Sequence, residues 1–141
     1  MICLSPSSGH MIGFVIPSSN SFRSRLLTIY GIQRWQGAPC HRWIPYIVRS
    51  RDLKEFELGI TNPIMWPDDG DKQIICPERF SAEQIDYIEH AVDCNNSDID
   101  LCYYNGKTLI TYSWGNQYGK EFLALAEYEG SVEEFLQSFF E

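Results

Sequence analysis

Two carboxylates in the stretch Asn95–Asp100 stand two residues apart and follow a pair of amides. In an extended strand Asp98 and Asp100 point to the same face, with roughly 6.5–7 Å between their Cα atoms. Paired carboxylates, one protonated and one ionised, are the groups that cleave a glycosidic bond. The competing interpretation is that Asp and Asn side chains before a strand only cap a turn.

An aromatic side chain beside planar amides forms a second candidate group, Trp114 with Asn116 and Gln117. An indole ring stacks on the C–H face of a sugar, while amides bind its hydroxyls. The alternative is that Trp114 packs inside the protein. Together the two groups predict a carbohydrate site without a metal or cofactor, formed by Asn95, Asn96, Asp98, Asp100, Trp114 and Asn116.

Metal and disulfide chemistry find less support in the sequence. The acids Asp68, Asp69, Asp71 and Glu78 lack the twelve-residue spacing of a calcium loop, so a solvated loop is predicted there. The five Cys are an odd number with no CxxC pair. Neither a disulfide framework nor a zinc site is therefore predicted, and the cysteines are expected to be free thiols.

The candidate residues lie on a regular β pattern. Asn105-Gly106 separates the runs Ile99–Tyr104 and Lys107–Ser113, and both residues of the pair tolerate the positive φ of a two-residue hairpin. A third alternating run, Glu121–Tyr128, completes a predicted antiparallel meander. Two capping boxes, Ser81 to Gln84 and Ser131 to Glu134, predict helices over residues 82–92 and 132–139.

Upstream of the meander the signals are shorter. Tyr46–Arg49 and Phe56–Leu58 are predicted strands joined by a turn at Ser50–Leu53, where Ser and Asp bond to the backbone. Phe22–Tyr30 is a predicted short strand. The remaining segments, Met1–Ser24 and Gln33–Arg42, are predicted to be irregular.

Charge divides the chain unevenly. The net charge is −8, yet the first 50 residues hold five Arg and no Asp or Glu. We predict an uncertain segment over residues 1–45, irregular or not native to this domain, followed by a domain over residues 46–141. A basic arm and a separate subdomain are the alternatives for the first segment. The acidic balance argues against nucleic acid or an anionic membrane as partner, and no run of about 18 apolar residues predicts a membrane span.

Several of these motifs resemble one family. The run from Ser50 to Glu57 is similar to the S-x-D-L-x-x-W-E element of five-bladed β-propeller glycoside hydrolases, with Phe56 where Trp is usual. This superfamily contains arabinanases, levansucrases and invertases, including families 43 and 32. Asp100–Ser113 resembles the opening strands of the next blade, and Tyr112–Leu136 resembles the chain end of a bacterial propeller-like group.

The resemblance, over about residues 46–141, implies a mainly β fold of about two propeller blades with two short helices. It implies the C-terminal part of a carbohydrate-active propeller protein that helps to bind sugar at the central channel. A non-catalytic carbohydrate-binding or structural module is the alternative. The family's three catalytic carboxylates belong to earlier blades and match nothing here, so the isolated chain is expected to be inactive. Its uncovered blade faces predict self-association.

Overall fold

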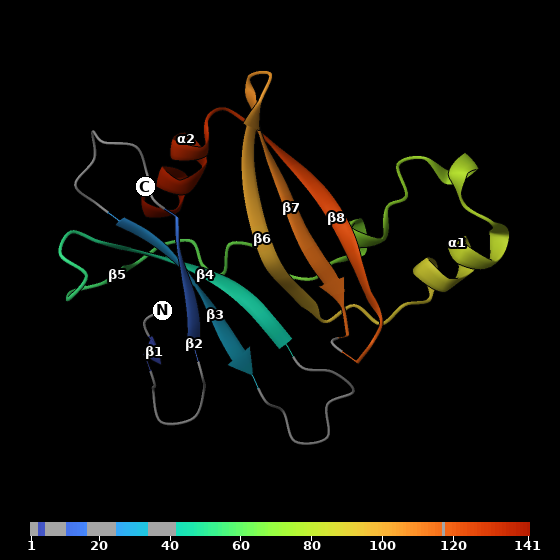
Figure 1. The fold of residues 1–141 in the computed structure, drawn as a ribbon, viewed down its shortest axis with the longest axis horizontal. Coiled ribbons are helices and arrows are strands. Elements are labelled where there is room, and N and C mark those ends of the chain that lie inside the picture. Colours follow the sequence, from blue (N-terminus) through green and yellow to red (C-terminus); the bar gives the residue numbers. More distant parts are fainter. Residues whose placement is uncertain (1–2, 5–10, 17–24, 34–41, 117) are drawn as a thin grey trace.

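The computed structural model describes residues 3–4, 11–16, 25–33, 42–116 and 118–141 of the chain. Its architecture is mainly β, with two antiparallel sheets and two short α-helices (Figure 1). The fold class predicted from the sequence is confirmed at this level. Within the described residues, no helix is long and apolar enough to cross a membrane.

The three-stranded sheet contains β6 (Asn95–Tyr104), β7 (Lys107–Gly115) and β8 (Glu121–Glu129) in sequence order. Tyr104 pairs with Lys107 across a two-residue turn. Asn105 and Gly106 adopt φ angles of 53° and 88°, the left-handed conformation that this turn requires. The predicted meander and its hairpin are therefore confirmed.

The five-stranded sheet corrects the prediction for the first part of the chain. Its strands, also in sequence order, are β1 (Cys3–Leu4), β2 (Met11–Ile16), β3 (Arg25–Gln33), β4 (Arg42–Ser50) and β5 (Glu57–Leu58). The irregular interpretation of Met1–Ser24 is wrong for β1 and β2. Strand propensity is a weak local signal, and pairing between neighbouring strands decides the conformation.

Sheet pairing also crosses the predicted boundary at residue 45. Ile29 pairs with Tyr46 and Tyr30 pairs with Pro45, so β3 and the longer-than-expected β4 form one ladder. The predicted loop Gln33–Arg42 lies largely outside the described residues, and its two end residues belong to strands. That residues 1–45 are not native to this domain stays a prediction.

The turn between β4 and β5 forms as predicted. Ser50 Oγ accepts a hydrogen bond from the Leu53 amide at 2.8 Å. Asp52 Oδ1 accepts from the amides of Lys54 and Glu55 at 2.8 and 3.0 Å. These amides hold the pKa of the Asp52 carboxyl below its usual value because they stabilise the charged form.

Both capping boxes start helices. Helix α1 (Ala82–Glu89) begins after Ser81, and helix α2 (Val132–Gln137) begins after Ser131. Three short 3₁₀ helices complete the described elements: η1 (Asp69–Lys72), η2 (Pro77–Arg79) and η3 (Ser138–Phe140). In Figure 1, α2 lies beside β6 on one side of the three-stranded sheet, while α1 lies beyond β8 on the other side.

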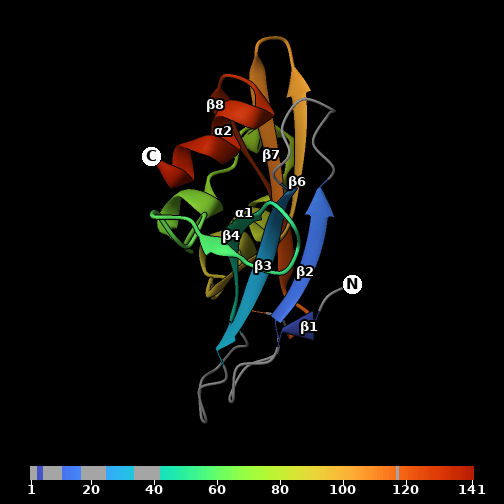
Figure 2. The ribbon, with the colours of Figure 1, turned by 90° about the vertical axis from the view of Figure 1, so that its left-hand side faces the viewer.

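The largest core cluster joins the two sheets through the C-terminal helices. Ile47 of β4 packs with one face of β7, where Ile110, Tyr112 and Trp114 alternate with less buried residues. The C-terminal segment adds the remaining large side chains, Phe135, Leu136, Phe139 and Phe140. In Figure 2 the long strands run lengthwise along the molecule with α2 to one side. This core fixes the inner face of the three-stranded sheet, on which the polar site described below is found.

Candidate functional site

The start of β6 contains a β-bulge. Ser97 pairs with Ser113 and Asp100 pairs with Thr111, so two residues of β6, Asp98 and Ile99, stand opposite one residue of β7. Asp98 has a φ of 54°, a left-handed conformation that is uncommon for any residue other than glycine. Bulges of this kind redirect side chains and are frequent beside functional sites.

The bulge changes the geometry expected for the two carboxylates. The extended strand assumed between Asp98 and Asp100 is wrong, because Asp98 lies in the left-handed region. Both side chains are exposed. Asp98 Oδ2 accepts a hydrogen bond from Ser97 Oγ at 3.0 Å, and Asp100 Oδ1 accepts one from the Leu101 amide at 3.0 Å. Local bonding of the capping type is thus present at both acids, and both carboxylates still reach solvent.

The two predicted amides of β6 are buried. Asn95 Oδ1 accepts a hydrogen bond from the Trp43 amide at 2.9 Å, which ties β6 to β4. Asn95 Nδ2 donates to Ser97 Oγ at 3.2 Å. Asn96 is only 1 % exposed. Both side chains therefore hold the strand in place and do not present polar atoms to a ligand at the surface.

Trp114 is also an interior residue. It is 2 % exposed and stacks on Phe122, with ring centroids 4.5 Å apart and an interplanar angle of 24°. Trp114 therefore packs inside the protein, which was the alternative interpretation, and its ring has no free face for a sugar. Asn116 is half-buried, and its Oδ1 accepts a hydrogen bond from the Tyr118 amide at 2.8 Å. Of the six predicted site residues, Asp98 and Asp100 are the ones fully at the surface.

A polar cluster that the sequence did not indicate lies on the inner face of the same sheet. Asp71, from η1, is 9 % exposed. Its Oδ1 accepts a hydrogen bond from the Tyr112 hydroxyl at 2.5 Å, and its Oδ2 accepts one from Asn96 Nδ2 at 3.1 Å. The prediction of a solvated acidic loop is wrong for Asp71, because η1 turns this carboxylate toward β6 and β7.

Asp93 lies beside Asp71. Burial and the neighbouring Asp71 carboxyl raise the pKa of Asp93 to about 7, and the backbone at Asn95 and Gly115 offsets part of this effect. The pKa of Tyr112 is raised as well, first by burial and then by its contact with Asp71. In the described part of the chain, both carboxylate oxygens of Asp93 are buried without a hydrogen bond of normal geometry. The same holds for Asn96 Oδ1.

The sequence contains one local signal for part of this polar cluster, the spacing of Asp68 and Asp71. Asp68 and Asp71 form a capping box on η1, in which the Gly70 amide donates to Asp68 Oδ1 at 2.6 Å and the Asp68 amide donates to Asp71 Oδ2 at 3.3 Å. The spacing D-x-x-D could have predicted a helix start. It contains no information about Tyr112, which lies 41 residues away in sequence.

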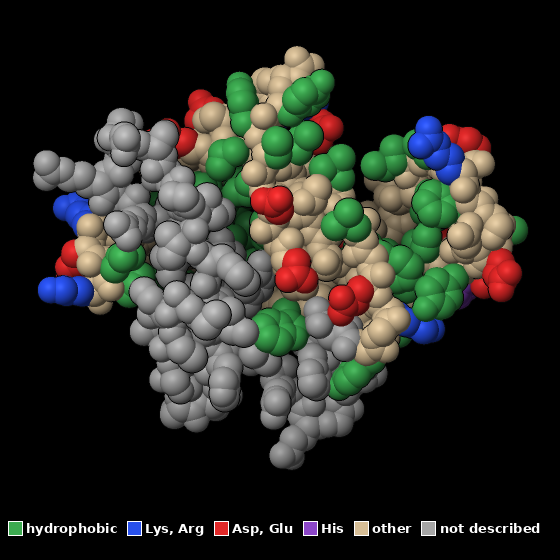
Figure 3. All heavy atoms as spheres, in the orientation of Figure 1, with side chains coloured by type: hydrophobic (Ala, Val, Ile, Leu, Met, Phe, Trp, Pro, Cys, Tyr) green, Lys and Arg blue, Asp and Glu red, His purple; other side chains and the backbone are tan. Residues whose placement is uncertain are grey.

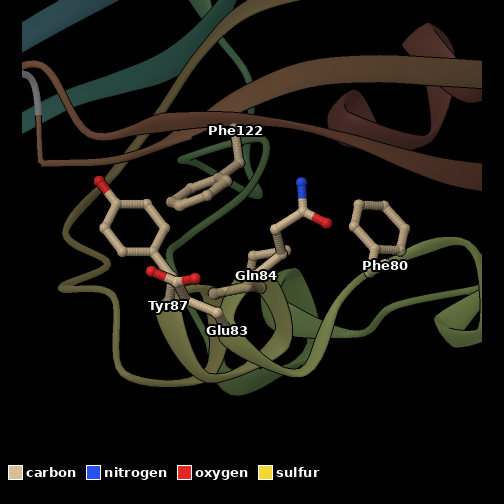
Figure 4. A pocket seen from close by; sticks show the side chains of 6 residues that line it. Phe80, Glu83, Gln84, Tyr87 and Phe122 are labelled. Atoms are coloured by element: carbon tan, nitrogen blue, oxygen red, sulfur yellow. The ribbon is translucent and has the colours of Figure 1, made fainter.

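A separate pocket of about 390 Å³ lies between α1 and β8 (Figure 4). Phe80, Tyr87 and Phe122 supply aromatic rings, and those of Tyr87 and Phe122 are 5.8 Å apart. The remaining lining residues are Glu83, Gln84 and Ile88. Because Gln84 Oε1 accepts the Ser81 amide of the capping box at 2.8 Å, its amide group is held between the rings.

The cysteines differ from the prediction at one position. Cys94 is disulfide-bonded, so the expectation of free thiols is wrong there. An odd number of cysteines leaves at least one unpaired, and it does not exclude a single bond. Cys76 and Cys102 are free. Among the described residues, no group of three or more His, Cys, Asp or Glu side chains is arranged to hold a metal ion.

The chain matches no protein-family model, and comparisons with curated proteins and with solved structures find no significant similarity.

Proposed function

We propose that this chain is the C-terminal part of a carbohydrate-active β-propeller protein and that it contributes Asp98 to a sugar site. The motifs Ser50–Glu57 and Asp100–Ser113 support the family, and they lie where one sheet ends and the next begins. The role of the chain in this proposal is ligand binding. The catalytic carboxylates of such a protein would belong to blades outside this sequence.

The arrangement of strands supports the proposal. Each sheet is an antiparallel meander whose strands pair in sequence order, which is the topology of a propeller blade. The counts of five and three strands differ from the usual four per blade. β6 is the first strand and an edge of its sheet, which is the position of a blade's innermost strand.

The observation that carries the proposal is the exposed carboxylate of Asp98 at the β6 bulge. A strained left-handed residue other than glycine persists only where its surroundings hold it, and such residues cluster at ligand sites. Ser97 orients the carboxylate with one hydrogen bond, so further lone pairs remain for sugar hydroxyls. Asp100 follows two residues later at the same edge and supplies a second exposed acid.

Saturation-transfer NMR and calorimetry with arabino-, xylo- and fructo-oligosaccharides test the proposal on the purified chain. Asp98→Asn is the informative change, because Asn tolerates the left-handed backbone and removes only the charge. Loss of a hydrogen bond to a charged group is worth about 1.5–3 kcal/mol, or roughly 10- to 150-fold in affinity. Asp100→Asn should have a smaller effect.

Glu133→Gln is the control, since Glu133 is an exposed acid on α2 and not part of the β6 bulge. Equal sugar binding by the wild type and Asp98→Asn would show that the carboxylate binds no sugar. A lowered melting temperature with unchanged binding would assign Asp98 a purely structural role at the bulge.

A further inference from the structure

The pocket between α1 and β8 has an aromatic lining that stays open to solvent. No residue of α1 is buried, and Phe80 and Tyr87 are 41 % and 45 % exposed. Phe122 also lines the pocket, and it is held in place by stacking on Trp114. The pocket volume of about 390 Å³ is within the range of small-molecule sites, about 300–1,000 Å³. The pocket therefore offers three aromatic rings to a small ligand.

The three rings come from different elements. Phe80 directly precedes the N-cap of α1, Tyr87 lies on that helix, and Phe122 lies on β8. The rings of Tyr87 and Phe122 are 5.8 Å apart and inclined at 59°, so their faces meet at an open angle. In Figure 4, Phe80 lies on the other side of the Gln84 side chain. Aromatic faces carry partial negative charge, so rings around one space attract a cation that enters it.

The lining also contains one carboxylate, that of Glu83. Among the six described residues that line the pocket, Glu83 is the charged one. It is exposed, and none of the ion pairs formed among the described residues involves it. Figure 4 shows its side chain extending toward Tyr87. The net charge of −8 on the whole chain favours the approach of a cation as well.

The Tyr87 ring already contacts an ammonium group of the chain itself. Lys120 Nζ lies 4.7 Å from the centroid of this ring. Lys120 is exposed, does not line the pocket, and takes part in none of the ion pairs among the described residues. The contact is an observation separate from the pocket, and it shows that a cation can reach the ring. Because a cation in the pocket would share this ring with Lys120, the two charges should oppose each other.

We infer that this pocket binds an alkylated ammonium group of the trimethylammonium type. Aromatic cages bind such cations through the ring faces, and the methyl groups can pack against the rings and Ile88. A primary ammonium is less suited, because its three donors need acceptors and Gln84 Oε1 already accepts the Ser81 amide. The inference is independent of the proposed sugar site, because Asp98 does not line this pocket.

Two probes of nearly equal shape separate charge from apolar packing. Choline carries a trimethylammonium group, and its uncharged carbon analogue carries a tert-butyl group in the same place. In NMR titrations of the purified chain at constant ionic strength, choline should cause saturable shifts of the Phe80, Tyr87 and Phe122 ring resonances. The uncharged analogue should bind at least about fivefold more weakly, the effect of one partly exposed cation–π contact. Equal affinities for the two probes, or no saturable shift with choline, would refute the inference.

Matched variants locate the bound cation. Tyr87→Leu should weaken choline binding about fivefold, whereas Tyr87→Phe keeps the ring and should keep the affinity. Lys120→Gln removes the opposing charge, so it should tighten the binding of choline and not that of the uncharged analogue. Glu83→Gln should weaken choline binding, and Glu89→Gln is its control, because Glu89 is an exposed acid on the same helix outside the lining. A choline affinity that responds to neither Tyr87→Leu nor Glu83→Gln would place the cation elsewhere and refute the site.

Discussion

Replacing Tyr112 by Phe isolates one hydrogen bond of the buried polar cluster. The hydroxyl of Tyr112 donates to Asp71 Oδ1 at 2.5 Å, and both residues are buried. Phe keeps the ring and its packing against the core, so no cavity larger than one oxygen atom arises. The change removes the strongest donor from a carboxylate that is withdrawn from water.

The expected cost follows from that geometry. A hydrogen bond to a charged group contributes about 1.5–3 kcal/mol, and a buried acceptor left without its donor is at the upper end. For a chain of this length, each kcal/mol shifts the melting temperature by about 3–4 °C, so a decrease of about 5–12 °C is expected. Differential scanning calorimetry and urea unfolding measure the change.

Tyr104→Phe is the matched control because Tyr104 is exposed at the end of β6. It should change the free energy of unfolding by less than about 0.5 kcal/mol, as is usual for surface substitutions. A double-mutant cycle with Asp71→Asn should give a coupling energy of at least about 1 kcal/mol. If Tyr112→Phe is as stable as Tyr104→Phe, or if the cycle shows no coupling, the role assigned to the Asp71–Tyr112 bond is refuted.

Three further predictions concern acid stability, catalysis and association. The pKa of Glu134 is lowered by hydrogen bonds from Ser131, so this carboxylate stabilises the fold above its usual pKa of 4.5 and loses that effect as pH falls through the lowered value. Glu134→Gln should therefore flatten the acid side of the stability curve below about pH 5 in urea titrations, and an unchanged curve would contradict it. The chain alone should not hydrolyse aryl arabinosides, xylosides or fructosides, because no acid–base pair with a matched motif is present; turnover abolished by Asp98→Asn would overturn this expectation. Leu123 and Leu125 are 76 % and 44 % exposed on β8, an edge strand whose surroundings mix apolar and acidic side chains (Figure 3). The chain should self-associate in size-exclusion chromatography with light scattering, and Leu123→Lys should reduce this; a wild-type monomer would refute the prediction.

Local chemistry accounts for the elements that the sequence predicted well. A two-residue turn needs positive φ at both positions, and Asn105-Gly106 meets that need without help from distant residues. Ser131 and Glu134 bond to each other's backbone within one helical turn. Ser50 and Asp52 likewise bond amides within three residues. Patterns of this range are contained in a short window of sequence.

Longer-range features depended on the tertiary structure. The strands β1 and β2 carry weak local signals, and their conformation follows from pairing with neighbouring strands. The exposure of Asp98 results from a bulge, which shifts the register by one residue and leaves no mark in an alternating pattern. The sequence left both a ligand contact and interior packing open for Trp114, and its burial against Phe122 places the ring in the interior.

The polar cluster shows the same division most clearly. The clustered acids Asp68, Asp69 and Asp71 were enough to predict an acidic loop, which the structure forms as a short helix with local hydrogen bonds. The burial of the Asp71 carboxylate depends on the tertiary structure, since its partners Asn96 and Tyr112 are 25 and 41 residues away in the sequence. The burial of a charge is a property of everything packed around it, and the packing of η1 against β6 and β7 is what removes Asp71 from water.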